Sequence, residues 1–105
     1  MILNIKEIIE VKPFKIHLLF SNNESREIDF ETIFKTENPE SVFLRLNNSE
    51  VFKQVKLDAE SKTIYWEGLA FYIDYDGKIK PGPLDIAPEF LYEISKPVSS
   101  EKIYH

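Results

Sequence analysis

The chain has no cysteine, only three glycines and only two histidines among its 105 residues. Without cysteine, disulfides, thiolate metal sites and cysteine nucleophiles are all excluded. The glycines all follow residue 67, so there is no glycine-rich phosphate loop and no nucleophile elbow. With 43% hydrophobic residues and no cysteine, the composition suits a reducing compartment, and we expect a cytoplasmic protein.

Long hydrophobic runs are absent as well. No apolar run approaches the roughly 18 residues that are needed to cross a bilayer. The apolar start contains Lys6, Glu7 and Glu10 and lacks the basic and small-residue features of a signal peptide. The formal net charge of -5 disfavours nucleic acid, because phosphate binding needs a concentrated basic face. We therefore expect no membrane partner, and one soluble domain over residues 1–97 with a loosely ordered tail over 98–105.

Hydrophobic residues alternate with polar ones in several segments, which is typical of half-buried strands. Residues 16–20 and 26–30 follow this pattern on either side of Asn22-Asn23, which predicts a hairpin. Residues 53–57 and 62–66 predict a second hairpin, with Leu57 pointing inward. Residues 67–84 contain the turn signal Asp76-Gly77 and predict a third, rather exposed ribbon.

Two helices are expected between and after these strands. Asn38 is a candidate N-cap and Pro39 the first helical residue of a middle helix that Asn47-Asn48 can end. A short C-terminal helix begins at Pro88, with Phe90 on its inner face, and stops at Pro97. The fold class is thus α+β: a mostly antiparallel sheet of about five to six strands, with both helices on one side. The predicted core consists of Phe20, Phe30, Phe43, Leu46, Val55, Ile64, Trp66 and Leu91.

Several phrases, taken in order, carry a resemblance to a known family. They are residues 20–30 (FSNNESREIDF), residues 42–58 (VFLRLNNSEVFKQVKLD), a strand that ends at Trp66, and residues 85–92 (DIAPEFLY). In these phrases the chain resembles the small bacterial proteins catalogued as domain of unknown function 2442. The resemblance implies an antiparallel α+β fold, no established activity, and a neighbouring small protein as a possible toxin–antitoxin or scaffolding partner.

The chain departs from that family in two ways. Residues 67–84 lengthen the usual connection between Trp66 and the closing phrase, so this ribbon resembles an insertion. The helix-turn-helix domain that some relatives append has no counterpart after Pro97. The resemblance therefore implies nothing about DNA binding here.

The residues that commonly carry chemistry are sparse. His17 lies in a strand and His105 is the last residue, so neither has a second ligand nearby. Asp74 and Asp76 bracket a turn whose spacing does not fit a calcium loop. We expect no catalytic residue, no cofactor and no metal, and hence not an enzyme.

The aromatic residues favour binding to a protein. Trp66 and Ile64 are expected in the core, which puts Tyr65 on the opposite face of its strand, where the last helix, the ribbon or another protein must cover it. We predict a non-catalytic protein-interaction module, with a homodimer as its simplest form. The candidate surface consists of Tyr65, Phe71, Tyr72, Tyr75, Lys78 and Lys80.

Two alternatives remain open from the sequence. The first is a small-ligand or weak enzymatic site, for which the candidates are Trp66, Tyr72, Asp74 and Asp85. The second is nucleic-acid binding through Lys78, Lys80 and Tyr75, since lysines interleaved with aromatics hold single strands.

Overall fold

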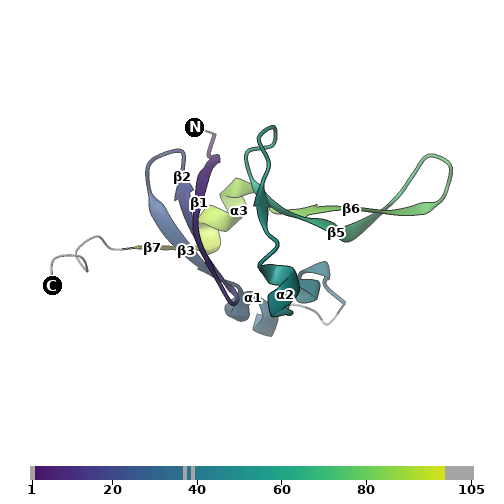
Figure 1. The fold of residues 1–105 in the computed structure, drawn as a ribbon, viewed down its shortest axis with the longest axis horizontal. Helices are drawn as coiled ribbons and strands as arrows, with labels where there is room; N and C mark the ends of the chain where they lie inside the picture. The colour runs from purple at the N-terminus through teal and green to yellow at the C-terminus, as the bar shows by residue number, and fades with distance from the viewer. Residues whose placement is uncertain (1, 37, 39, 99–105) are drawn as a thin grey trace, which may run out of the picture.

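The computed structural model describes residues 2–36, 38 and 40–98 and shows an α+β fold with two antiparallel sheets (Figure 1). The first sheet has the order β1-β2-β3-β7, with β1 at Ile5–Lys12, β2 at Lys15–Phe20, β3 at Ser25–Asp29 and β7 at Lys96–Pro97. The second has the order β4-β5-β6, with β4 at Lys56–Leu57, β5 at Ile64–Ile73 and β6 at Ile79–Asp85.

The expectation of one sheet with five to six strands is therefore wrong in its detail. The predicted hairpins exist, but they belong to two separate sheets. The reason lies in the helices at residues 30–36, 42–46 and 49–52, which separate β3 from β4 along the chain. Alternation identifies strands and neighbouring pairs, but it does not say which hairpins share a sheet.

The first hairpin, β2–β3, follows directly from its sequence. Ile16 and Leu18 are fully buried on one face of β2, and Ile28 lies opposite Ile16 in the register. Asn23 adopts a φ of 69° at the turn, a conformation that asparagine tolerates better than most residues. The Asn22 side chain accepts a hydrogen bond from the Glu24 amide at 3.0 Å, which closes the turn.

Strand β3 is followed by a helix that the alternating pattern did not predict. Helix α1 spans Phe30–Thr36, and Asp29 accepts a hydrogen bond from the Glu31 amide at 3.0 Å, as a capping side chain does. Phe30 is buried at its first residue, so the alternation of Ile28 and Phe30 continues one residue past the end of β3. This continuation made the start of the helix look like strand.

The predicted middle helix is two shorter elements. Helix η1 at Val42–Leu46 is a 3-10 helix capped by Ser41, and α2 spans Ser49–Phe52. The Asn48 side chain accepts hydrogen bonds from two amides of α2, so it begins a helix rather than ending one. Pro39 lies outside the described residues.

The C-terminal helix, α3, spans Pro88–Ile94 and buries Leu91. Phe90 is exposed rather than inward, because it precedes the buried Leu91 and so lies on a different side of the helix. Leu57 is exposed too, because β4 is an edge strand of its sheet. After α3 the chain pairs with β3, and the Val98 amide donates to the Ser25 carbonyl at 2.9 Å. The remainder of the expected tail, 99–105, lies outside the described residues.

One core lies between the two sheets and the helices, and Trp66 is at its centre. Its indole is 1% exposed, donates to the Phe52 carbonyl at 2.9 Å, and packs against Phe30 and Phe52 with ring centroids 5.9 Å away. Trp66 is thus a structural residue whose polar atom is satisfied. Of the predicted core, Phe43 and Val55 are half-buried, and the buried members are Phe20, Phe30, Leu46, Ile64, Trp66 and Leu91.

No helix in the described ranges is long and apolar enough to span a membrane.

Candidate functional site

Beyond Trp66, strands β5 and β6 leave the body of the molecule as a two-stranded projection, which we call the arm (residues 69–83; Figure 1). A register shift separates the pairs Trp66–Leu84 and Ala70–Gly82, and Gly68 there has a φ of 72°. Irregularities of this kind bend a strand and increase its twist. The bulge therefore marks the point where the sheet stops covering the core and the arm begins.

The arm ends in a tight turn with its own hydrogen bonds. The Asp74 amide donates to the Lys78 carbonyl at 2.9 Å, and the Gly77 amide donates to the Asp74 carbonyl at 2.8 Å. Gly77 has a φ of 81°, as expected for the left-handed residue that closes a three-residue hairpin loop. The Asp76 side chain accepts from the Lys78 amide at 2.9 Å, so it serves the turn.

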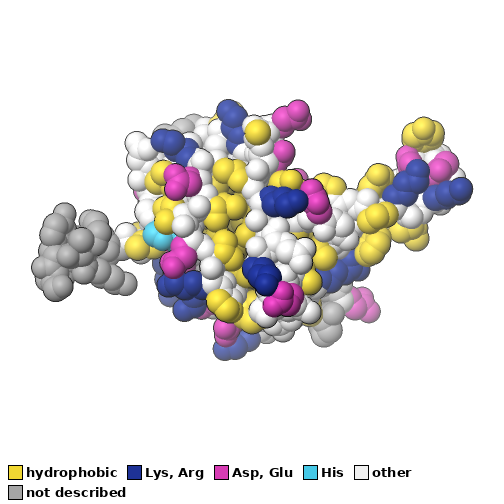
Figure 2. All heavy atoms as spheres, in the orientation of Figure 1, with side chains coloured by type: hydrophobic (Ala, Val, Ile, Leu, Met, Phe, Trp, Pro, Cys, Tyr) yellow, Lys and Arg dark blue, Asp and Glu magenta, His cyan; other side chains and the backbone are white. Residues whose placement is uncertain are grey.

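One face of the arm is apolar throughout. The register places Phe71 opposite Pro81 and Ile73 opposite Ile79, and residues that pair directly share a face. Phe71, Ile73 and Ile79 are 57%, 73% and 71% exposed, and no charged side chain belongs to this row. We call these four residues the apolar arm face; the hydrophobic side chains along the arm are visible in Figure 2.

The other face of the arm is satisfied within the chain. The Tyr72 ring covers Gly82 so closely that a Cβ on Gly82 would lie 3.0 Å from two ring carbons. Lys80 lies 2.6 Å from the Asp74 carboxylate and 3.7 Å from that of Asp76. These contacts stiffen the arm, whose apolar face stays largely exposed to solvent.

The lysines of the arm do not form a basic stripe. Lys80 is paired with Asp74, and Lys78 lies beside the same acidic turn, so the charges at the tip balance. Tyr75, the third residue of the nucleic-acid hypothesis, is fully exposed at the turn. This arrangement offers a phosphate backbone little net attraction.

Arg45, near the end of η1, contacts the base of the arm, and no pattern in the sequence predicted this contact. Its Nη1 donates to the Leu69 carbonyl at 2.5 Å, and its Cζ lies 4.8 Å from the centroid of the Phe71 ring. The contact spans residues 24 apart in the chain, so no local pattern could have revealed it. Phe71 is thus oriented by a cation–π contact.

Tyr65, predicted as part of the same surface, lies elsewhere. It is half-buried, faces Lys56 and Asp85 across the sheet, and lines a polar cavity of about 200 Å³. Asp58 lies at this cavity too, and the Ser61 hydroxyl lowers the pKa of its carboxyl by donating a hydrogen bond. The predicted surface therefore divides into the Tyr65 cavity and the arm.

The four residues of the small-ligand hypothesis are not brought together. Trp66 points into the core, whereas Asp85 shares the opposite sheet face with Tyr65. Tyr72 covers Gly82 on the arm, and Asp74 closes the turn at its tip. No pocket in the described part of the chain contains all four.

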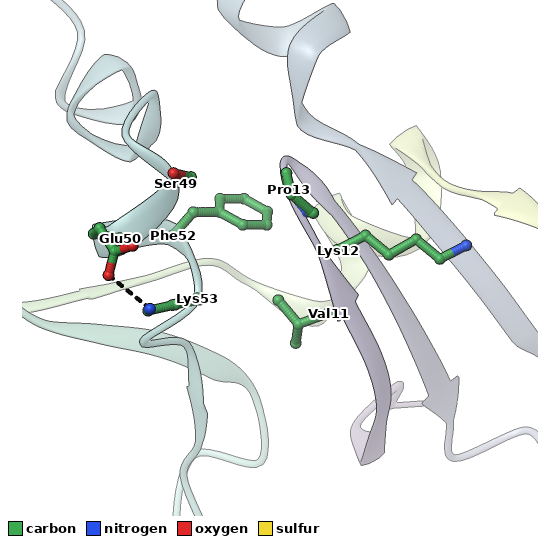
Figure 3. A pocket seen from close by; sticks show the side chains of 7 residues that line it. All are labelled: Val11, Lys12, Pro13, Ser49, Glu50, Phe52 and Lys53. Carbon is green, nitrogen blue, oxygen red and sulfur yellow. Dashed lines mark ion pairs between the residues drawn. The ribbon is translucent and has the colours of Figure 1, made fainter.

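A further cavity of about 300 Å³ lies between the β1–β2 turn and α2 (Figure 3). Phe52 points across it toward Pro13, while the ammonium group of Lys12 points away. Glu50 and Lys53 form an ion pair of 2.6 Å at one side. Their charges satisfy each other, so the cavity has an apolar wall but no converging polar groups that would define a ligand.

His17 and Ser25 form the described contact that most resembles catalytic chemistry. The His17 Nε2 and Ser25 Oγ are hydrogen-bonded across strands β2 and β3. Neither residue lines the two cavities above, and no hydrogen bond from another described side chain orients the ring. The pair thus lacks the positioned third group that an activated nucleophile needs.

A polar cluster joins the β2–β3 hairpin to α3 and to Ser95, the residue that follows this helix. Arg26 donates to Glu24 at 2.8 Å, to the Ser95 hydroxyl at 2.5 Å and to the Ser95 carbonyl at 3.0 Å. Its Cζ lies 4.2 Å from the centroid of the Tyr92 ring, and the Tyr92 hydroxyl donates to Glu24 at 2.5 Å. We call Glu24, Arg26, Tyr92 and Ser95 the α3 latch, because together they fasten α3 to the first sheet.

The latch shifts two pKa values. The hydrogen bond from Tyr92, with the nearby Arg26 guanidinium, lowers the pKa of the Glu24 carboxyl. The same hydrogen bond is the main reason why the pKa of the Tyr92 phenol is raised, because it favours the neutral phenol beside a carboxylate.

Replacing Glu24 by glutamine is expected to change how stability depends on pH. A carboxyl whose pKa is lowered by folding stabilises the protein above its unfolded pKa, and this contribution is lost as the pH falls through the folded pKa. The free energy of unfolding should therefore differ most between wild type and Glu24→Gln at neutral pH. Urea unfolding at several pH values should show the difference shrinking below about pH 4. A difference independent of pH would contradict the latch as an ionic contact.

No protein family matches the chain, and comparison with curated proteins and with solved structures found no match either. The resemblance to domain of unknown function 2442 consequently stays a prediction from the sequence.

Proposed function

We propose that this protein is a non-catalytic protein-interaction module that binds its partner through the apolar arm face. The observation that carries the proposal is the exposure of Phe71, Ile73 and Ile79 on a projection that the chain itself stiffens. Contiguous exposed apolar residues of this kind mark interaction sites in soluble proteins. A rigid arm also loses little conformational entropy when it is bound.

A protein fits this surface better than other classes of partner. The face contains an aromatic ring and branched aliphatic side chains, which are typical of the centre of protein interfaces. A polar small molecule would find no hydrogen-bonding side chain within the row. A nucleic acid would find the Arg45 guanidinium beside Phe71 but no basic stripe, because Lys80 is paired with Asp74.

The proposal also includes the compartment and the family of the protein. We infer that the chain is a cytoplasmic relative of the family of domain of unknown function 2442. In that setting the arm would be an elaboration by which this chain binds a neighbouring small protein as its antitoxin-like or scaffolding partner. The absence of cysteine and the four sequence phrases support this placement.

The test replaces Phe71, Ile73 and Ile79 by threonine, which keeps strand propensity and removes apolar area. Ile9→Thr is the matched control, because Ile9 is an exposed isoleucine on β1, outside the arm. Affinity-tagged wild type, triple variant and control would be expressed in the native host and cross-linked. Proteins recovered with each, untagged copies of the chain included, would be identified by mass spectrometry.

We expect the wild type and Ile9→Thr to recover the same partner, and the triple variant to lose it by at least about tenfold, or about 1.4 kcal/mol. Equal recovery by the triple variant would show that the arm face is not the binding surface. Recovery of no protein by the wild type would count against an interaction module altogether.

A further inference from the structure

The two edges of the arm differ in what they can bind. On the β6 edge, Pro81 and Pro83 have no N–H group and so cannot donate to a further strand. On the β5 edge, residues 70–73 (AFYI) contain neither proline nor a charge. Uncharged, proline-free edges are templates for strand pairing, whereas proline protects an edge.

The hydrogen-bonding pattern shows which groups the β5 edge presents. Antiparallel pairs alternate between hydrogen-bonded and non-hydrogen-bonded, and the Asp74–Lys78 pair is hydrogen-bonded. The pairs Ile73–Ile79 and Phe71–Pro81 are consequently of the non-hydrogen-bonded kind, which agrees with a proline at residue 81. The N–H and C=O groups of Phe71 and Ile73 therefore point away from β6, toward the open edge.

We propose that the β5 edge binds the β5 edge of a second copy of this chain, around a two-fold axis at Tyr72. Pairing Phe71 with Ile73 of the other copy, and the reverse, joins four residues whose N–H and C=O groups already point outward. Tyr72 then faces Tyr72 of the second copy as a non-hydrogen-bonded pair on the axis. The proposal rests on the proposed function and names the partner of the same arm.

The difference between the edges is what favours a second copy and a closed dimer. If both edges were open, β5 of one copy could pair with β6 of the next, and such head-to-tail contacts build filaments. The prolines of β6 prevent that pairing, so the open edge of one copy meets only an open edge of another. A two-fold contact of this kind uses one self-complementary surface and ends at two copies.

In the same register, the exposed Tyr75 of each copy would contact the other copy. With Tyr72 on the axis, Tyr75 of each copy lies beside Leu69 of the other, where Arg45 is held. Pairing of the two edges covers backbone groups and only part of the exposed side chains of Phe71, Tyr72, Ile73 and Tyr75, because the faces of the strands stay open to solvent. A contact of this kind is smaller than a standard specific interface, so we expect a weak dimer with a dissociation constant in the micromolar range.

Both apolar arm faces lie on one side of the four-stranded sheet that results. Phe71 of each copy pairs directly with Ile73 of the other, and directly paired residues point to the same face of a sheet. The dimer thus presents a doubled apolar surface, on which a different protein can still bind.

The experiment is disulfide trapping in a chain that has no cysteine of its own. Tyr72→Cys places a thiol on the axis, where the expected Cα separation of about 4.5 Å permits a disulfide. Ile79→Cys is the control, because Ile79 is equally exposed but belongs to the β6 strand, away from the axis. Both purified variants would be oxidised with glutathione buffer at micromolar concentration and separated on non-reducing gels.

We expect Tyr72→Cys to form the covalent dimer at least about tenfold faster than Ile79→Cys, because association raises the effective thiol concentration. Equal rates, or no dimer from Tyr72→Cys, would overturn the proposal. Circular dichroism of each variant would show that it is folded. Should Tyr72→Cys not fold, the molar mass of wild type decides, and one chain at all concentrations up to about 1 mM would equally overturn the dimer.

The two proposals fail in different ways. If Tyr72→Cys does not cross-link but the triple threonine variant still loses a partner of another sequence, only the dimer is wrong. If the triple variant keeps its partner, the proposed function itself is wrong.

Discussion

Replacing Trp66 by alanine is expected to lower the free energy of unfolding by about 3–5 kcal/mol, the usual cost of removing a large aromatic side chain from a core. Trp66 is 1% exposed and packs against Phe30 and Phe52. The substitution also removes the shorter of two hydrogen bonds that the Phe52 carbonyl accepts, and leaves the one from the Val55 amide at 3.3 Å. The loss of this buried hydrogen bond adds to the cost.

Urea unfolding followed by far-ultraviolet circular dichroism measures this loss, since the variant has no tryptophan fluorescence. Trp66→Phe is the matched variant: it restores much of the ring volume but not the N–H donor, so its loss should be intermediate. Were Trp66→Ala to cost less than about 1 kcal/mol, Trp66 would not be the centre of the core.

Replacing Arg26 by alanine is the second large effect, with an expected loss of about 2–3 kcal/mol, as for removal of hydrogen bonds to charged groups. The Arg26 side chain is only 13% exposed. Within the α3 latch its guanidinium donates to the Glu24 carboxylate and to the hydroxyl and carbonyl of Ser95. Its removal leaves the Ser95 hydroxyl and carbonyl without the guanidinium donor, and takes one of several donors from Glu24. Helix α3 then loses its main polar attachment to the first sheet.

Arg26→Lys is the control, because it keeps the charge but cannot donate to Glu24 and Ser95 together through a planar fork. It should therefore recover only part of the loss in urea unfolding. Amide exchange should show the largest increase in α3 and β7, whose attachment depends on the latch. A uniform increase over the whole chain would instead mean that the cluster does not act locally.

The hairpins were predictable because their information is local. Alternation from Ile16 to Phe20, and the tolerance of Asn23 for positive φ, determine β2, its turn and β3 within a few residues. The end of β3 was not predictable, because Phe30 serves the core equally well from a strand or from the first turn of α1.

The division into two sheets depends on contacts between distant residues. Nothing in β4 or β5 distinguishes a strand that extends the first sheet from one that begins another. The α3 latch joins residues 68 to 69 positions apart, and Arg45 reaches the arm across 24 positions, so neither was visible in a local pattern.

The sequence predicted an exposed ribbon at the arm. It also predicts which residues share a face, because side chains alternate between the two faces of a strand. Phe71 and Ile73 are separated by one residue, so they share a face wherever the strand is regular. The sequence grouped Tyr65 with them as one candidate surface. The bulge between Trp66 and Ala70 separates the two regions, and only the structure reveals it.

Amide hydrogen exchange of the unmodified chain is the most direct test that the β5 edge binds a second copy. In one copy, the amides of Phe71, Ile73 and Ile79 all point away from the partner strand of the arm, so all three should exchange rapidly. As the protein concentration rises through the micromolar range, we expect the amides of Phe71 and Ile73 to become protected while that of Ile79 does not. Rapid exchange of all three amides at every concentration would contradict it.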